Sequence, residues 1–462
     1  MIPASGHRFS LSMPINLSEL AKSLAEQGIR RLAITWVNHA GAPLVKVVPL
    51  TAFAGAVERG VGFSPVSDAF RADGQIDAAH RLAVPDGDLR LRADPAALAP
   101  LEPATGWAWA PGERWQRQGM PYANDQRSFC RRQQECLQEA NLSLQAGFEL
   151  EWLLASAEPD GTAKPVLAGG PYGADRLVEG LDYATAICDA LDAAGLPWQQ
   201  FHPEYGSSQF ELSLAAGSPL QAADRLVLTK LLIQRVSLRF GWRCSFSPKP
   251  RLQHVGNGGH LHLSVQRGGI PLLQGGDGPG ELSSAGSQVV AALLAELPAL
   301  MALACPLGVS YLRLQPGTWS APFQVWGVEN REAALRLIPA AGDGAGAHLE
   351  LKVADLAANP YLLLGAVQAV VLNGLSQARI LPPPISGDPA GQAPGQIQRL
   401  PATLAQASAA FAANAVLQAA MGEALHGSLI DSQAAELRRC EGLDAEALVA
   451  ASRWWPLVGG LN

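Results

Sequence analysis

The sequence lacks the features that mark a secreted, disulfide-stabilised or membrane-spanning protein. Its six cysteines include no CxxC pair and no regular spacing, which is typical of reduced thiols used as small apolar side chains, so a cytoplasmic location is expected. The N-terminus lacks the basic and then apolar run of a signal peptide. The most apolar segment, residues 289–312, is interrupted by Glu296, Pro298 and Pro306. It is therefore predicted to be a buried helix and not a membrane span.

Positive charge is not in excess either. Lys and Arg number 34 against 41 Asp and Glu, a formal net charge of −7, which argues against nucleic acid and anionic membranes as partners. Charged residues make up 16% and hydrophobic residues 48% of the chain, the composition of a compact globular protein. A chain of 462 residues can form two or three domains around a large core.

The local patterns predict a small N-terminal α+β domain, residues 14–112, and a large second domain, residues 120–462. In the first we expect a helix at 16–25, strands at 31–36 and 44–49 joined by a turn at 38–41, a last strand at 106–110, and then a linker.

In the second domain, helices and strands mix without strict alternation, which predicts an α+β fold with an antiparallel sheet that carries polar residues on one face. The predicted helices span 125–141, 181–194, 219–240, 283–304, 361–376, 400–412 and 431–439. The predicted strands span 142–155, 198–201, 209–215, 243–248, 259–266, 323–326, 334–337 and 347–353.

The stretch HPEYGSSQFE at 202–211 organises the candidate site. It places Glu204 before a glycine turn and Glu211 on a strand whose alternate residues, Gln209 and Glu211, share one face. Two carboxylates that face one point repel each other unless a cation lies between them, and oxygen ligands suit Mg²⁺ or Mn²⁺. A solvated edge strand is the simpler reading of this stretch alone.

Three further stretches repeat this device. Glu149 and Glu151 lie two residues apart on a predicted strand, so both leave the same face while their apolar neighbours enter the core. His260 and His262 follow a glycine-rich entry that allows close approach of the backbone to a ligand. Glu350 shares a face with Lys352. Each pair alone could be a wet surface or a satisfied core histidine, and only their combination favours a metal site.

Three arginines, Arg313, Arg331 and Arg336, lie among apolar residues between these stretches. An unpaired guanidinium is costly there, so each is expected to meet a carboxylate or phosphate. One such arginine would more often form a structural salt bridge. Three of them beside five acids favour an anionic substrate bound with metal ions.

In order and spacing these residues resemble the glutamine synthetase family, from about Leu17 to Leu457. The resemblance depends on seven motifs in order. They are GxExE at 147–151, ExGxxQxE at 204–211, an FxPKP-like segment at 246–250, a GxGxHxH-like segment at 256–262, RLxPG at 313–317, NREAALR at 330–336 and ELKVADLAANPYL at 350–362.

The resemblance implies an α+β fold with a small β-grasp-like N-terminal domain and a large catalytic domain of the glutamine synthetase/guanido kinase type. It implies two to three Mg²⁺ or Mn²⁺ ions, with ATP as co-substrate. One metal site would consist of Glu151, Glu204 and Glu211, and the other of Glu149, His260 and Glu350, a residue also expected to act in catalysis. Residues that match positions meeting ATP are Lys249, His262, Ser264 and Arg336. Residues that match the glutamate or amine positions are Ser64, Gly258, Arg313, Trp319 and Lys352, and Arg331 matches the catalytic arginine that stabilises the transferring phosphate.

The chain departs from the family's pattern at positions that matter for the amine. Ser64 and Trp319 stand where glutamine synthetases carry an aspartate and a glutamate of the ammonium site. Lys352 replaces an arginine of the glutamate site and so loses the bidentate fork. Val255 replaces an asparagine.

The resemblance and its departures predict an ATP-dependent ligase that forms a γ-glutamyl amide from L-glutamate and an amine larger than ammonia, through γ-glutamyl phosphate. The alternatives are a true glutamine synthetase and a non-catalytic relative. The resemblance further implies a homo-oligomer, a dodecamer of two hexameric rings, in which a neighbour's N-terminal domain completes each site.

Overall fold

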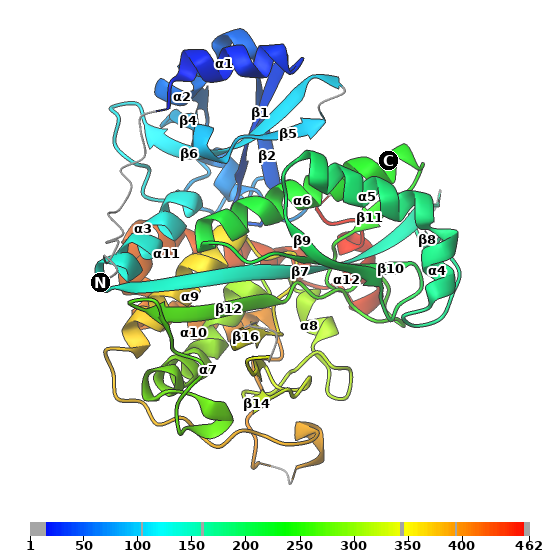
Figure 1. Ribbon diagram of the computed structural model, residues 1–462, viewed down its shortest axis with the longest axis vertical. Helices are drawn as coiled ribbons and strands as arrows, with labels where there is room; N and C mark the ends of the chain where they lie inside the picture. Colours follow the sequence, from blue (N-terminus) through cyan, green and yellow to red (C-terminus); the bar gives the residue numbers. More distant parts are fainter. Residues whose placement is uncertain (1–14, 103–104, 159–160, 342–345, 393–394, 457–462) are drawn as a thin grey trace, which may run out of the picture.

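The computed structural model describes residues 15–102, 105–158, 161–341, 346–392 and 395–456. Its N-terminal part is a six-stranded sheet of order β2–β1–β6–β4–β3, with β5 paired to β6 and two helices beside it (Figure 1). The strands are β1 (Arg31–Val37), β2 (Pro43–Pro49), β3 (Val61–Phe63), β4 (Leu89–Ala93), β5 (Ala99–Glu102) and β6 (Trp107–Gln116), and the helices are α1 (Leu17–Glu26) and α2 (Phe53–Glu58).

Strand β6 is longer than expected, because the residues predicted to form a linker continue the sheet to Gln116. Within this extension the Arg114 side chain is fully buried and lies 2.6 Å from Asp68 and 2.8 Å from Asp125. Internal ion pairs therefore satisfy the Arg114 charge within a segment that was predicted to be a linker. The proposed limit of the first domain at residue 112 falls inside this strand.

The predicted turn at 38–41 lies where the N-terminal part packs against the large second part of the chain. The Asn38 Oδ1 accepts the Ala42 N–H at 2.9 Å, and Gly41 has a φ of +80°. A Cβ at Gly41 would lie 2.2 Å from the Ala357 carbonyl oxygen, so only glycine allows this close approach.

The large sheet has ten strands in the order β14–β15–β16–β12–β7–β10–β9, with β8 and β11 on β7 and β13 on β12. All of these pairs are antiparallel except β14–β15. The strands are β7 (Leu142–Ala157), β8 (Ala163–Pro165), β9 (Trp198–Pro203), β10 (Gln209–Leu214), β11 (Arg243–Ser245), β12 (Leu261–Arg267), β13 (Ile270–Pro271), β14 (Trp326–Val328), β15 (Leu335–Ile338) and β16 (His348–Leu351).

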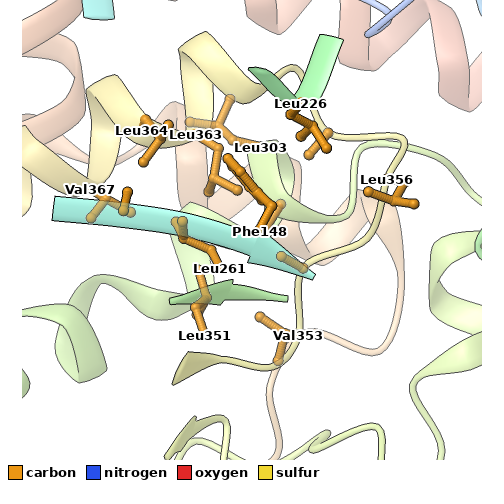
Figure 2. Close-up of a cluster of buried hydrophobic side chains, with 14 of the residues drawn as sticks. Phe148, Leu226, Leu261, Leu303, Leu351, Val353, Leu356, Leu363, Leu364 and Val367 are labelled. Carbon is orange, nitrogen blue, oxygen red and sulfur yellow. The ribbon is translucent and has the colours of Figure 1, made fainter. Parts of the chain in front are cut away.

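Helices cover one face of this sheet. The second part of the chain contains the helices α3 (Gln126–Glu139), α4 (Ala174–Glu179), α5 (Leu181–Ala193), α6 (Pro219–Arg239), α7 (Ser284–Ala304), α8 (Ser310–Arg313), α9 (Pro360–Gly374), α10 (Leu404–Ala412), α11 (Ala415–Cys440) and α12 (Ala445–Ser452). In Figure 2, Phe148 of β7 and Leu261 of β12 meet Leu226 of α6, Leu303 of α7 and Leu363 of α9, each at most 3% exposed. Burial of each such side chain contributes about 1.5–3 kcal/mol.

Helix α7 is long and apolar enough to cross a membrane, but 72% of its apolar window is buried inside the protein. It packs against α9 and α10, which confirms the prediction of a buried helix. The predicted α+β class with a largely antiparallel sheet is also confirmed.

Further elements also differ from expectation. Strand β14 begins at Trp326, because residues 323–325 bond irregularly to the chain at 398–400, as the Gln324 N–H to the Gln398 carbonyl does at 2.9 Å. Helix α11 begins at Ala415 and not at residue 431. Its first half has buried residues four apart, which is a helical signal, but Gly422, at a φ of +76°, interrupts the pattern.

Candidate active site

The register of the large sheet aligns the candidate ligands on the face opposite the helices. On β7, Phe148, Leu150 and Trp152 are buried in the core, so the alternating Glu149 and Glu151 point to the other face. Antiparallel pairing places Glu211 of β10 directly opposite Glu151. On the other side of β7, the Glu149 N–H donates to the His260 carbonyl at 3.0 Å. The predicted carboxylate face therefore forms across three adjacent strands.

The same row continues toward the sheet edge. His262 of β12 is opposite Glu350 of β16, and Glu350 is opposite Arg336 of β15. Directly opposite residues in a sheet have Cβ atoms about 4.5–5.5 Å apart, and here the side chains meet: Arg336 Nη1 lies 3.0 Å from Glu350 Oε2. Ser264, two residues along β12, shares the face of His262.

Two imidazoles face the same pair of carboxylates. His260 Nδ1 lies 3.1 Å from Glu149 Oε2 and 3.4 Å from Glu350 Oε1, as expected for the predicted group. His262 Nε2 lies 3.2 Å from Glu149 Oε1, and ligand atoms of Glu149, His262 and Glu350 all lie within 4.8 Å of one another. His262, predicted to meet ATP, is therefore also within reach of a metal ion bound by these carboxylates.

The second predicted group combines Glu151, Glu204 and Glu211, and its members repel one another. Burial, together with the charges of Glu211 and Glu204, raises the pKa of Glu151 to about 7 although His260 opposes the shift. Burial and Glu211 also raise the pKa of Glu204. Hydrogen bonds satisfy only part of this charge: Glu151 Oε2 accepts the Gly258 N–H at 2.9 Å and a Gln209 Nε2 hydrogen at 3.2 Å.

The other carboxylates carry full charge. Although burial opposes it, Lys352 and His260 lower the pKa of Glu350 to about 2, and Lys352 Nζ lies 3.2 Å from Glu350 Oε1. Burial likewise opposes the shift at Glu149, where hydrogen bonds from His260 and His262 hold the pKa well below its usual range.

This donor set fits divalent cations. Carboxylate oxygens crowded on one face, one of them with its pKa raised to about 7 by burial and its neighbours, would be stabilised by a positive ion. Oxygen with imidazole ligation suits Mg²⁺ or Mn²⁺. Gly258 leaves room for it, because a Cβ there would lie 2.4 Å from His260 Nε2 and 2.8 Å from Glu151 Oε1.

Two residues predicted to bind glutamate or ATP lie beside the carboxylate face. Arg313 is 7% exposed and donates to the carbonyls of Val353 and Ala354, while its buried Nε has no partner. The half-buried Lys249 donates to the carbonyl of His254.

Three predicted residues lie away from this row. Trp319 is 61% exposed, and Arg331 is exposed in the loop before β15. Ser64 accepts the Val66 N–H at 3.3 Å in the N-terminal part. Figure 1 shows this part and β14 at opposite ends of the molecule.

Several residues without a predicted role support the site. Gln209 also donates to the Gly256 carbonyl and to Asn257 Oδ1, and Asn257, 1% exposed, donates to the carbonyls of Ser245 and Ser247. A glutamine two residues before a ligand on the same strand face was the available signal for this support. His202 lies 3.4 Å from Glu211, and its hydrogen bond with Glu211 raises its pKa to about 9.

Comparison with known proteins is consistent across sequence and structure. Residues 123–446 match the family model of the glutamine synthetase catalytic domain. Over 444 residues the chain is 42% identical to the Gamma-glutamylpolyamine synthetase GlnA3 of Streptomyces coelicolor, across 94% of this chain and 95% of that protein. The glutamine synthetase of Pyrococcus horikoshii is 29% identical over 75% of this chain and 74% of its own. The glutamine synthetase of Thermus thermophilus is 30% identical over 69% of this chain and 73% of its own length.

Two solved structures share the fold. One, described as a novel glutamine synthase homolog, has a TM-score of 0.82 and 29% identity over 91% of this chain and 97% of its own. A complex of GmaS with ADP also has a TM-score of 0.82, with 27% identity over 92% of this chain and 97% of its own.

Proposed function

The chain belongs to the glutamine synthetase family, and from this premise we propose that it joins the γ-carboxylate of L-glutamate to a polyamine, at the expense of ATP. It is a carbon–nitrogen ligase, and its amine is larger than ammonia. The relative that matches 94% of the chain at 42% identity is named for polyamines, whereas the glutamine synthetases of Pyrococcus horikoshii and Thermus thermophilus match 75% and 69% of it, at 29% and 30% identity.

The observation that carries this proposal is the indole at Trp319. The motif RLxPG fixes the alignment, so an exposed tryptophan stands where glutamine synthetases have an acid of the ammonium site. A carboxylate can hold a small hydrated cation and accept its proton, whereas an indole N–H only donates. An indole can instead line an apolar volume or contact a substituted ammonium through a cation–π interaction of about 0.5–2 kcal/mol.

We assign two or three Mg²⁺ or Mn²⁺ ions to the carboxylate face. Glu151, Glu204 and Glu211 would hold one ion, and Glu149, Glu350 and an imidazole of His260 or His262 another. The ions would neutralise phosphate charge and polarise the γ-phosphoryl group of ATP.

The protein's own cations would complete this site. Arg336 is fixed by its ion pair with Glu350 and, with Lys249, His262 and Ser264, is proposed to bind ATP. Burial and the charge of Glu204 raise the pKa of the Tyr172 phenol to about 12. Arg331 lies close enough to Tyr172 to oppose this rise. Its exposed guanidinium is therefore free to offset charge on a phosphoryl group in transfer.

Glutamate requires a cation for its α-carboxylate and exclusion of water from its activated γ-carboxyl group. Arg313, with Gly258 beside it, is proposed to bind the α-carboxylate. Lys352, already 3.2 Å from Glu350, brings positive charge to the same region. An acyl phosphate formed here is a good electrophile for an uncharged amine.

Isotope transfer tests this proposal. With ATP, Mg²⁺, putrescine and L-glutamate labelled with ¹⁸O in its γ-carboxylate, we expect one labelled oxygen in the released phosphate and γ-glutamylputrescine as product. Release of unlabelled phosphate, or phosphate release with no amide, would contradict it.

We also propose that the enzyme works in the cytoplasm as a homo-oligomer, a dodecamer of two hexameric rings. Support comes from the N-terminal part of the chain, which carries Ser64 and lies at the opposite end of the molecule from β14 (Figure 1). The resemblance implies that this part completes the amine site of a neighbouring subunit.

A further inference from the structure

A buried carboxylate holds the loop that carries Trp319. Glu332, just before β15, is 7% exposed, and its Oε1 accepts the Trp319 N–H at 2.7 Å. The backbone N–H of Ala321 also stabilises the Glu332 charge. One side chain thus holds the loop through a hydrogen bond at Trp319 and an electrostatic contact with the Ala321 N–H.

The backbone of this loop is strained at the two residues whose N–H groups interact with the Glu332 carboxylate. Trp319 has a φ of +55° and Ala321 a φ of +57°, in the left-handed region that residues with a side chain rarely adopt. Such strain persists only where the surroundings enforce it. Left-handed residues turn successive N–H groups toward one point and so form a site for an anion, and here the anion is Glu332.

The other hydrogen bonds of this loop join residues within it, so they do not fix its orientation. We infer that the contact with Glu332 does. Thr318 and Ser320 both donate to the Gln315 carbonyl, at 2.7 and 3.0 Å. Glu332 in turn is placed by its own N–H, which donates to Asn330 Oδ1 at 3.0 Å. The indole is left exposed at the surface and not folded under the loop.

The carboxylate is also within electrostatic reach of Lys352, a cation assigned to the glutamate site. Its Oε2 is buried without a hydrogen-bond partner. Burial raises the pKa of Glu332, and the charge of Asp388 adds to this rise. The backbone N–H groups of Trp319 and Ala321, together with Lys352, oppose it.

We propose that Glu332 is a positioning residue for the amine: its carboxylate fixes the backbone at Trp319 and Ala321 so that the indole lines the amine subsite. It acts through Trp319 and need not contact the substrate. This inference rests on the proposed function, because it assumes that the amine meets Trp319.

A double-mutant cycle tests the inference. We expect Glu332→Ala to raise the KM for the polyamine about tenfold, with kcat within about threefold and the KM for glutamate unchanged. Glu332→Gln, which keeps one acceptor oxygen, should have a smaller effect. Trp319→Ala should raise the same KM, and adding Glu332→Ala to it should change nothing further. Independent, additive losses, or a loss confined to kcat, would overturn the proposal.

A fluorescence measurement separates this inference from the proposed function. Among the residues that the structure describes, Trp319 is the one tryptophan with a largely exposed side chain. Acrylamide quenching of the fluorescence, after subtraction of the signal of Trp319→Phe, therefore reports on its indole. Glu332→Ala should change this quenching, whereas Asp388→Asn, which removes a neighbouring negative charge without touching the loop, should not. Unchanged quenching in Glu332→Ala would overturn the inference even if no amine proved to be a substrate.

Discussion

Glu211 shows how single residues define the carboxylate face. It stands opposite Glu151 in the sheet register and is 8% exposed. Replacing it by alanine leaves two carboxylates to hold an ion, too few to offset phosphate charge. We expect Glu211→Ala to abolish turnover while the circular dichroism spectrum and melting temperature remain close to those of wild type. Full activity in this variant, or in EDTA-treated wild type, would refute the metal assignment.

The raised pKa of Glu151 predicts a pH-dependent stability in metal-free protein. Folding raises this pKa from its ordinary value near 4.5 to about 7, so between these values the folded state binds the proton more tightly than the unfolded state. Stability from this group is present at low pH and is lost as the pH rises from about 4.5 through 7, by on the order of 3 kcal/mol.

Urea denaturation in EDTA at pH 5 to 8 tests this expectation. Wild type should lose stability across the range more steeply than Glu151→Gln, whose amide cannot titrate, and Mg²⁺ should remove the difference. Parallel profiles of the two proteins without metal would contradict it.

Packing between helices sets the strongest constraints at the scale of elements. Helix α9 lies against α3 so closely that a Cβ at Gly365 would be 2.4 Å from the Phe129 ring. We expect Gly365→Ala to lower the free energy of unfolding by about 1–3 kcal/mol through overpacking, in spite of a gain of about 1 kcal/mol in helix propensity.

Gly391 is the matched control, because a Cβ there would meet nothing within 4 Å. Gly391→Ala should change the free energy of unfolding by less than about 0.5 kcal/mol. Equal stability of the two variants in urea would show that the α3–α9 contact is looser than described.

The sequence predicted best the elements whose signal is local. Period-two alternation placed Glu149 and Glu151 on one face, and Asp125 was available as a helix cap, as its bond to the Ser128 N–H confirms. It failed where distant partners decide. The end of β6 depends on the burial of Arg114 against Asp68, and neither residue reveals that contact locally.

The candidate site shows the same division. Strand alternation predicted which side chains share a face, but only the register between strands brings His262 opposite Glu350. The role of Glu332 could not be predicted from the sequence, because it depends on the left-handed backbone at Trp319 and Ala321. Residue types alone do not predict that conformation.

At the scale of the whole molecule, the proposed ring assembly predicts shared active sites, because the N-terminal part that carries Ser64 would complete a neighbour's site. Ser64→Arg and Glu211→Ala should each be inactive. When the two variants are co-expressed, about a quarter of the sites in a mixed ring should combine two intact halves. Recovered activity in mixed oligomers, sized by light scattering, would support this arrangement. An active monomer, or no recovery in mixed rings, would contradict it.

The choice of amine tests the central claim most directly. We would measure kcat/KM for ammonium, putrescine and spermidine with saturating ATP, Mg²⁺ and glutamate, in wild type and Trp319→Glu side by side. The account predicts much better turnover of a polyamine than of ammonium by wild type, and a partial return toward ammonium in the variant. A wild-type kcat/KM for ammonium equal to or above that for every substituted amine would contradict it.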